Sequence, residues 1–233
     1  QYRNSEGTGR YEDYALRELI PAVEKEFNCG GEGNRVIAGK SSGGYGAFTL
    51  CVRNPGYFTA CACHAADMGF ESGYRREFPE ALNVWRRYGG PAAFLEKMES
   101  GELSMGTPEH AALDAMAMSS CYSPNPDSEL GFDLPVDTET GEPIDEVWDR
   151  WVVHDPLNLV LEESNASALR ELKLLFLDAG ECDEFALQWG LRRLIPRLEK
   201  MDIAHRAEFF DGGHFNTDHR YETSLPLLLS ELV

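Results

Sequence analysis

The chain has 233 residues, 42% of them apolar, which is the length and composition of one globular domain with a sizeable core. Its 40 acidic and 21 basic residues give a formal charge of −19, which repels phosphate backbones and anionic lipid headgroups. Nucleic acid is therefore not expected as a partner, and because every apolar run is too short to cross a bilayer, no membrane span is expected either.

The six cysteines are too scattered for a disulfide framework and predict buried free thiols. Cys61, Cys63 and His64 lack a second ligand pair at zinc-site spacing, so burial in a strand is favoured over a metal site. Gln1 is not a start methionine, and no secretory signal is visible, which is consistent with a fragment or a processed product. The cytoplasm is slightly favoured as the compartment, and the oligomeric state is unknown.

Helices and strands are predicted to alternate along the chain. Apolar residues at three- and four-residue steps predict a helix over 12–27, which a glycine cluster ends. The elements that follow are a strand at 34–38, a glycine-rich helix at 43–52, a strand at 58–64, a strand at 172–177, a helix at 185–200, a strand at 207–210 and a helix at 221–232. This alternation predicts an α/β fold with a mostly parallel sheet and helices on both faces.

Residues 70 to 150 interrupt the alternation with weak helices near 80–88 and 108–118 and with proline-rich turns. The segment is too long for a simple connection, so it predicts a cap inserted into a single domain over residues 1–233. Trp148 and Trp151 within it are expected to fill a core rather than to line a pocket.

A nucleophile motif lies between the first two predicted strands. Gly39-Lys40-Ser41-Ser42-Gly43 fits the G-x-S-x-G elbow, in which small flanking residues let the chain turn tightly and expose the serine. The motif directly follows a predicted buried strand and opens a helix, which makes Ser41 the candidate nucleophile. The backbone N–H of Ser42, at the start of that helix, is the candidate oxyanion donor.

A serine hydroxyl needs a base, and histidine suits that role at neutral pH. His214 stands in a glycine-rich turn directly after the last strand, where its ring can face the crevice at the carboxyl ends of parallel strands. The other five histidines are less well placed: His64 reads as a satisfied core residue, His154 as structural or substrate-side, His205 as lying at the wrong end of a strand, and His110 and His219 as lacking strand-end context.

The base in turn needs a carboxylate that fixes its tautomer. Asp183 follows the strand at 172–177 after a short loop and is favoured. Its rival Asp178 continues the strand and is expected to point into packing or into a hydrogen bond with a loop. Glu181 and Glu184 are interpreted as solvated loop charges. The order serine, aspartate, histidine is the one expected of an α/β-hydrolase.

Three segments, residues 39–47, 180–185 and 210–214, resemble the putative esterase family of α/β-hydrolases. That family includes S-formylglutathione hydrolases, feruloyl esterases, enterochelin esterases and mycolyltransferases. The resemblance runs from about Tyr11 to the end and implies Ser41, Asp183 and His214 as the triad.

The chain departs from the family pattern in two places. Lys40 stands where histidine is frequent before the nucleophile. No strand is predicted ahead of the helix at 12–27, whereas the family domain begins with several strands, and the second oxyanion donor normally comes from a loop after one of them.

Together these features predict a serine carboxylic-ester hydrolase that acts on a small-molecule ester through an acyl-enzyme and needs neither metal nor organic cofactor. Two alternatives stay open. An acyltransferase would use the same triad, and a non-catalytic binding protein would have kept only the fold.

Overall fold

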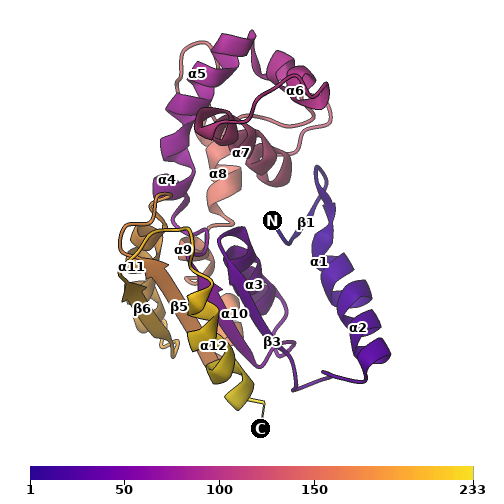
Figure 1. Cartoon of the computed structure of the whole chain (residues 1–233), viewed down its shortest axis with the longest axis vertical. Coiled ribbons are helices and arrows are strands. Elements are labelled where there is room, and N and C mark those ends of the chain that lie inside the picture. The colour runs from indigo at the N-terminus through magenta and orange to yellow at the C-terminus, as the bar shows by residue number, and fades with distance from the viewer. Residues whose placement is uncertain (233) are drawn as a thin grey trace. The chain divides into compact units, whose positions relative to one another are not determined.

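The computed structural model describes residues 1–232 and divides the chain into two compact units (Figure 1). Unit 1 comprises Gln1–Asn4, Arg10–Gly73 and the chain from Asp155 onward, and unit 2 comprises Ser5–Gly9 and Tyr74–His154. The segment predicted as an insertion, residues 70 to 150, thus falls almost wholly within unit 2.

Unit 1 is built on a sheet of four parallel strands. Their spatial order is β3 (Val36–Lys40), β4 (Ala60–His64), β5 (Leu174–Gly180) and β6 (Arg206–Phe210). In the register of this sheet, Lys40, His64 and Asp178 lie at one level near the carboxyl ends of their strands. The predicted α/β class and mostly parallel sheet are confirmed.

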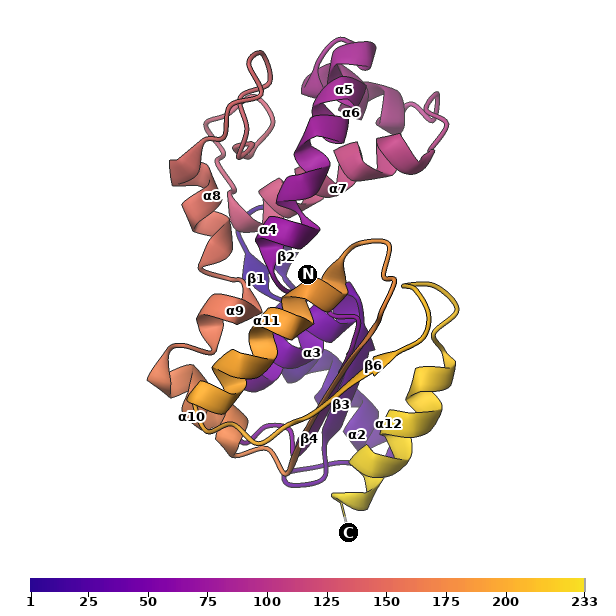
Figure 2. The ribbon, with the colours of Figure 1, turned by 90° about the vertical axis from the view of Figure 1, so that its left-hand side faces the viewer.

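Helices cover both faces of the sheet. Helices α3 (Ser42–Arg53), α10 (Glu163–Arg170) and α11 (Leu187–Lys200) share one core with the sheet, whereas α12 (His219–Ser230) packs on the other face. Figure 2 shows α11 and α12 on opposite sides of the strands. The short helices α4 (Phe70–Gly73) and α9 (Pro156–Leu159) complete unit 1 on the α11 side.

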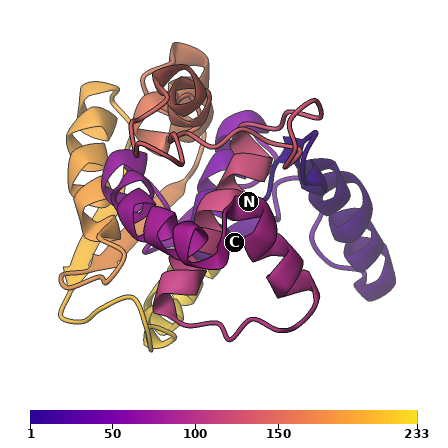
Figure 3. The same ribbon diagram turned by 90° about the horizontal axis from the view of Figure 1, so that it is seen from above.

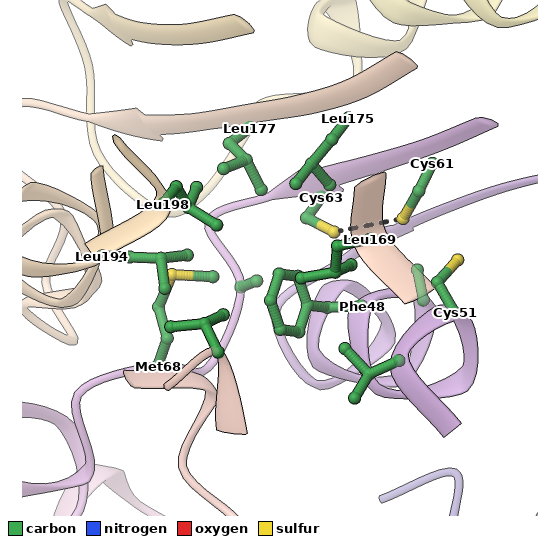
Figure 4. Close-up of a cluster of buried hydrophobic side chains, with 14 of the residues drawn as sticks. Phe48, Cys51, Cys61, Cys63, Met68, Leu169, Leu175, Leu177, Leu194 and Leu198 are labelled. Atoms are coloured by element: carbon green, nitrogen blue, oxygen red, sulfur yellow. Dashed lines mark hydrogen bonds between the residues drawn. The ribbon is translucent and has the colours of Figure 1, made fainter. Parts of the chain in front are cut away.

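The larger core surrounds Phe48, which is fully buried, and includes Leu177 and the thiols of Cys61 and Cys63 (Figure 4). The two sulfur atoms are 3.5 Å apart, and hydrogen bonding to Cys51 and Cys63 together with burial raises the pKa of the Cys61 thiol well above its usual value. All six cysteines are free, but Cys29 and Cys182 are exposed, so the prediction of buried thiols is wrong for these two.

The amino-terminal segment differs from its prediction in two ways. Two short strands, β1 (Asn4–Ser5) and β2 (Gly9–Arg10), form a separate ribbon where no strand was predicted. The predicted helix is continuous but carries a π-helical stretch, η1 (Tyr14–Leu19), between α1 (Tyr11–Asp13) and α2 (Ile20–Phe27). Much of its apolar face, including Val23 and Phe27, is exposed.

Between residues 75 and 152, unit 2 consists of helices and of loops, the longest of which is 123–144. It contains the 3₁₀ turn η2 (Arg75–Glu77) and the helices α5 (Phe78–Tyr88), α6 (Pro91–Glu99), α7 (Thr107–Tyr122) and α8 (Asp145–Val152) (Figure 3). Trp151 is fully buried, and its ring contacts Phe78 and Trp148 at centroid distances of 5.9 and 5.5 Å. The two tryptophans therefore fill the core of unit 2, as predicted. None of the helices in the described part of the chain has the length and apolar character to cross a membrane.

Candidate active site

Ser41 lies between the last residue of β3 and the first residue of α3, with backbone angles φ 57° and ψ −126°. A non-glycine residue seldom adopts a positive φ, and such a conformation is retained only where its surroundings hold it. Three backbone hydrogen bonds do so here: the Ser41 N–H donates to the carbonyl of His64 at 2.8 Å, and the Ser41 carbonyl accepts the N–H groups of Tyr45 at 2.9 Å and of Asp67 at 3.4 Å. The sequence motif is thus a strand–turn–helix elbow.

The two glycines of the motif serve different purposes. A Cβ atom at Gly39 would lie 2.1 Å from the carbonyl oxygen of Gly43 and 2.8 Å from the backbone nitrogen of Gly44, whereas a Cβ at Gly43 meets nothing within 4 Å. Gly39 is therefore required for the close approach of β3 to the first turn of α3.

This difference gives a matched pair of substitutions. We expect Gly39→Ala to lower the free energy of unfolding by about 1–3 kcal/mol, because the added methyl group meets immobile backbone. Gly43→Ala should change it by less than about 1 kcal/mol, in the favourable direction, because alanine is the better helix residue. Urea unfolding followed by circular dichroism measures both, and equal losses in the two variants would contradict this account of the elbow.

The Ser41 hydroxyl lies 3.5 Å from Oδ1 of Asp67, to which it donates, and the other Asp67 oxygen accepts from Nε2 of Gln1 at 3.2 Å. Within the described residues 1–232, the Ser41 hydroxyl is hydrogen-bonded to Asp67 and the His214 ring to Asp183, and the two groups are not hydrogen-bonded to each other. Catalytic hydrogen bonds are often long before substrate binds. Asp67 lies in the loop just past the end of β4, which is Ala60–His64.

His214 and Asp183 form a close buried pair. Nδ1 of His214 and Oδ2 of Asp183 are 2.8 Å apart, and only 4% and 5% of these residues is exposed. The other Asp183 oxygen accepts the backbone N–H groups of Phe185 at 2.9 Å and of Leu187 at 3.4 Å. Asp183 is thereby fixed at the start of α11 with one oxygen left for the ring.

The other carboxylates near this loop agree only in part with expectation. Asp178 is buried, as expected for packing, and the partners of its side chain are His64 in β4 and Arg220 in α12 instead of a loop. Glu184 is more than a solvated charge, because its Oε2 accepts the backbone N–H of His214 at 2.5 Å. Glu181 is exposed and pairs with Arg192 at 2.5 Å.

Helix α3 begins at Ser42, so the Ser42 N–H is among the first N–H groups of a helix, which have no acceptor within their own helix. These groups carry the positive end of the helix dipole. These N–H groups can therefore donate hydrogen bonds to a negative charge that develops beside Ser41.

Two aromatic rings lie against His214. The ring of Phe185 lies 4.7 Å from the His214 ring in an edge-on arrangement, and the ring of Phe215 lies 5.5 Å from it. Phe215 is 58% exposed, and the ammonium of Lys40 is 5.8 Å from its centroid. An apolar surface with the positive charge of Lys40 beside it therefore borders the His214 ring.

Metal-binding geometry is not found in the part of the chain that the structure describes, where no three His, Cys, Asp or Glu side chains are grouped as ligands. Strand alternation places Cys61 and Cys63 in the α3-side core, whereas the His64 ring bonds to Ser224 in α12 on the other face. The three side chains of the Cys-x-Cys-His stretch are thus separated.

The parallel sheet covered on both faces, with the elbow at the carboxyl end of β3, defines an α/β-hydrolase fold. The family model described as Putative esterase matches residues 1–226, and the chain belongs to this family.

Solved structures agree with this fold. A ferulic acid esterase matches 99% of the chain with a TM-score of 0.57 at 17% identity. FphF, a fluorophosphonate-binding serine hydrolase of Staphylococcus aureus, matches 100% with a TM-score of 0.55 at 15% identity. The S-formylglutathione hydrolase FrmB of Staphylococcus aureus matches 100% with a TM-score of 0.53 at 15% identity.

The chain covers only part of these proteins: 64% of the ferulic acid esterase and 67% of each of the two staphylococcal proteins. Among curated proteins, no sequence matches the chain.

Proposed function

We propose that the chain is a serine carboxylic-ester hydrolase in which Ser41 is the nucleophile, His214 the general base and Asp183 the carboxylate that orients the base. The observation that carries the proposal is the buried pair of His214 and Asp183, whose Nδ1 and Oδ2 atoms are 2.8 Å apart. The two residues lie in loops that follow β6 and β5, and β3 of the same sheet leads into the elbow at Ser41. This combination is the one that acyl transfer through a serine requires.

In the proposed reaction, Nε2 of His214 takes the Ser41 proton while Oγ attacks the ester carbonyl. Asp183 keeps the ring in the tautomer that has its proton on Nδ1 and stabilises the imidazolium that forms. The Ser42 N–H donates to the oxyanion of the tetrahedral intermediate, which collapses to an acyl-enzyme as His214 protonates the departing alcohol. Water, activated by the same base, then releases the acid.

In the proposed reaction, the Ser41 hydroxyl has to change its hydrogen-bond partner. The Ser41 hydroxyl must exchange its 3.5 Å contact with Asp67 for the His214 ring. A rotation about the Cα–Cβ bond moves the hydroxyl between staggered positions without moving the backbone. We infer that Asp67 holds the hydroxyl between turnovers.

The proposed substrate is a small-molecule ester. The exposed ring of Phe215 beside the proposed base favours an ester with an apolar part close to the scissile bond. The larger segment of unit 2, Tyr74–His154, is inserted in the chain between β4 and β5. We propose that unit 2 is a cap within a single hydrolase domain and selects the substrate.

Labelling with a fluorophosphonate probe tests the proposal, because the probe reacts with an activated serine and not with an ordinary one. We expect one adduct, located on Ser41 by peptide mass spectrometry, and we expect its formation rate to fall by about a thousandfold or more in His214→Ala. Absence of labelling in the folded chain, or an equal labelling rate without His214, would favour a non-catalytic binding protein.

A further inference from the structure

A second serine–histidine–aspartate array lies on the opposite face of the sheet, under α12. Nδ1 of His64 is 2.9 Å from Oδ1 of Asp178, and Nε2 of His64 is 2.8 Å from Oγ of Ser224. The exposed fraction is 2% for His64, 1% for Asp178 and 0% for Ser224, so no substrate reaches the Ser224 hydroxyl. This array is therefore not a second active site.

Charged side chains extend the array across the sheet. The other oxygen of Asp178 accepts from Nε of Arg220 at 2.7 Å, and the same guanidinium donates to Glu208 at 2.6 Å. Glu208 also accepts from Arg206 at 2.6 Å. Burial acts to lower the pKa of Arg220, but the hydrogen bonds to the two carboxylates outweigh it and raise that pKa above its ordinary value.

The network holds both ends of the loop that carries His214. That loop runs from the end of β6 to the start of α12, and Glu208 lies in β6 whereas Arg220 lies in α12. The 2.6 Å bond between them closes the loop at its base. The guanidinium also lies 4.9 Å from the ring centroid of Phe210, the last residue of β6.

The same network also contacts the backbone close to Asp183 and Ser41. Asp178 lies in β5, five positions before Asp183, and its backbone carbonyl accepts the Ala65 N–H at 2.7 Å. The carbonyl of His64 accepts the N–H of Ser41 at 2.8 Å. One hydrogen-bonded network thus contacts the backbone beneath all three positions of the proposed triad.

We propose that His64, Asp178 and Arg220 are positioning residues that hold the His214 loop in register with Ser41; this inference rests on the proposed function. The network is buried at His64, Asp178 and Ser224 and partly buried at Arg220 and Glu208, and its members are paired. Such a network has few alternative arrangements, so it fixes the relative height of the strands and of α12, which flank the reacting groups. Because catalysis depends on placement to within about 1 Å, loosening the network slows turnover without weakening substrate binding in proportion.

Two substitutions of Arg220 test this. Lysine keeps the charge but lacks the planar fork that serves two carboxylates, and glutamine removes the charge. We expect kcat for a small activated ester, divided by the fraction of chains that titrate with the fluorophosphonate probe, to fall by about ten- to a hundredfold in Arg220→Gln, with KM changed less than about twofold. Arg220→Lys should lie between Arg220→Gln and the unaltered chain.

Leu228→Ala is the matched control, because Leu228 is fully buried in the same helix but packs on Ala60, Ala62 and Phe176 instead of the charged network. It should lower the midpoint of urea unfolding and leave kcat per titrated site unchanged. If Arg220→Gln does not fold, Ser224→Ala removes one neutral hydrogen bond and should lower kcat severalfold in a folded chain.

The outcomes separate the two proposals. If the unaltered chain hydrolyses the ester and the folded Arg220 variants keep its kcat per titrated site, or if Leu228→Ala loses kcat to the same extent, the positioning role is wrong and the proposed function stands. If the unaltered chain neither hydrolyses an ester nor reacts with the probe, the proposed function itself is wrong.

Discussion

Replacing Ser41 with alanine is expected to lower kcat for a small activated ester by on the order of 10⁵- to 10⁶-fold, the loss typical of removing the nucleophile from a serine hydrolase. In the proposed mechanism, Oγ of Ser41 is the atom that forms the acyl-enzyme. Initial rates with a p-nitrophenyl ester, measured over several decades of enzyme concentration, determine the residual activity.

Ser42→Ala is the control for this substitution. It removes a neighbouring hydroxyl but keeps the backbone N–H that the proposed oxyanion site uses, so its kcat should stay within about threefold of the unaltered chain. Similar rates for Ser41→Ala and the unaltered chain would show that the nucleophile is elsewhere. A large loss in Ser42→Ala would show that its side chain takes part.

Asp183→Asn is expected to lower kcat by on the order of 10⁴-fold. The asparagine oxygen can keep the hydrogen bonds from Phe185 and Leu187, so the loop should fold as before. The amide nitrogen would then face Nδ1 of His214 and favour the tautomer that has its proton on Nε2, which cannot accept a proton from Ser41. The comparison should be made at equal folded fraction, judged by circular dichroism.

Glu181→Gln is the matched control for Asp183→Asn, because Glu181 belongs to the same loop and is exposed. Its pair with Arg192 is a surface ion pair, which contributes at most about 1 kcal/mol to stability. We expect unchanged kcat. If Asp183→Asn keeps more than a tenth of the activity, another group orients the base.

The four strands of the parallel sheet were predictable because each contains a short, mainly apolar run of the length of a buried strand, and because turn residues bound the runs. Their ends were less predictable. Strand β5 extends to Gly180, three residues beyond the predicted end, because Asp178 stays in the ladder through its pairing with His64. Helix α11 starts at Leu187 instead of 185, because Ala186 adopts a φ of 61° directly before it.

Asp183 and His214 were predictable because each follows a predicted strand within a short loop, and strand ends and glycine-rich turns can be recognised from the local sequence. The contact of Ser41 with Asp67 and the network through Arg220 were not visible. Both join elements that are distant in sequence, and a single sequence contains no signal that pairs His64 with a residue 114 positions later. Asp67 could have been found, since it lies just past a strand end beside the elbow.

The backbone of Ser41 imposes a conflict between folding and chemistry. Its φ of 57° and ψ of −126° suit glycine, and keeping a side chain there costs roughly 1–3 kcal/mol. Selection for stability alone would therefore move position 41 toward glycine and remove the hydroxyl. A serine at this position lowers the thermal tolerance of the chain, and stabilising substitutions elsewhere have to offset that loss if the proposed nucleophile is to be kept.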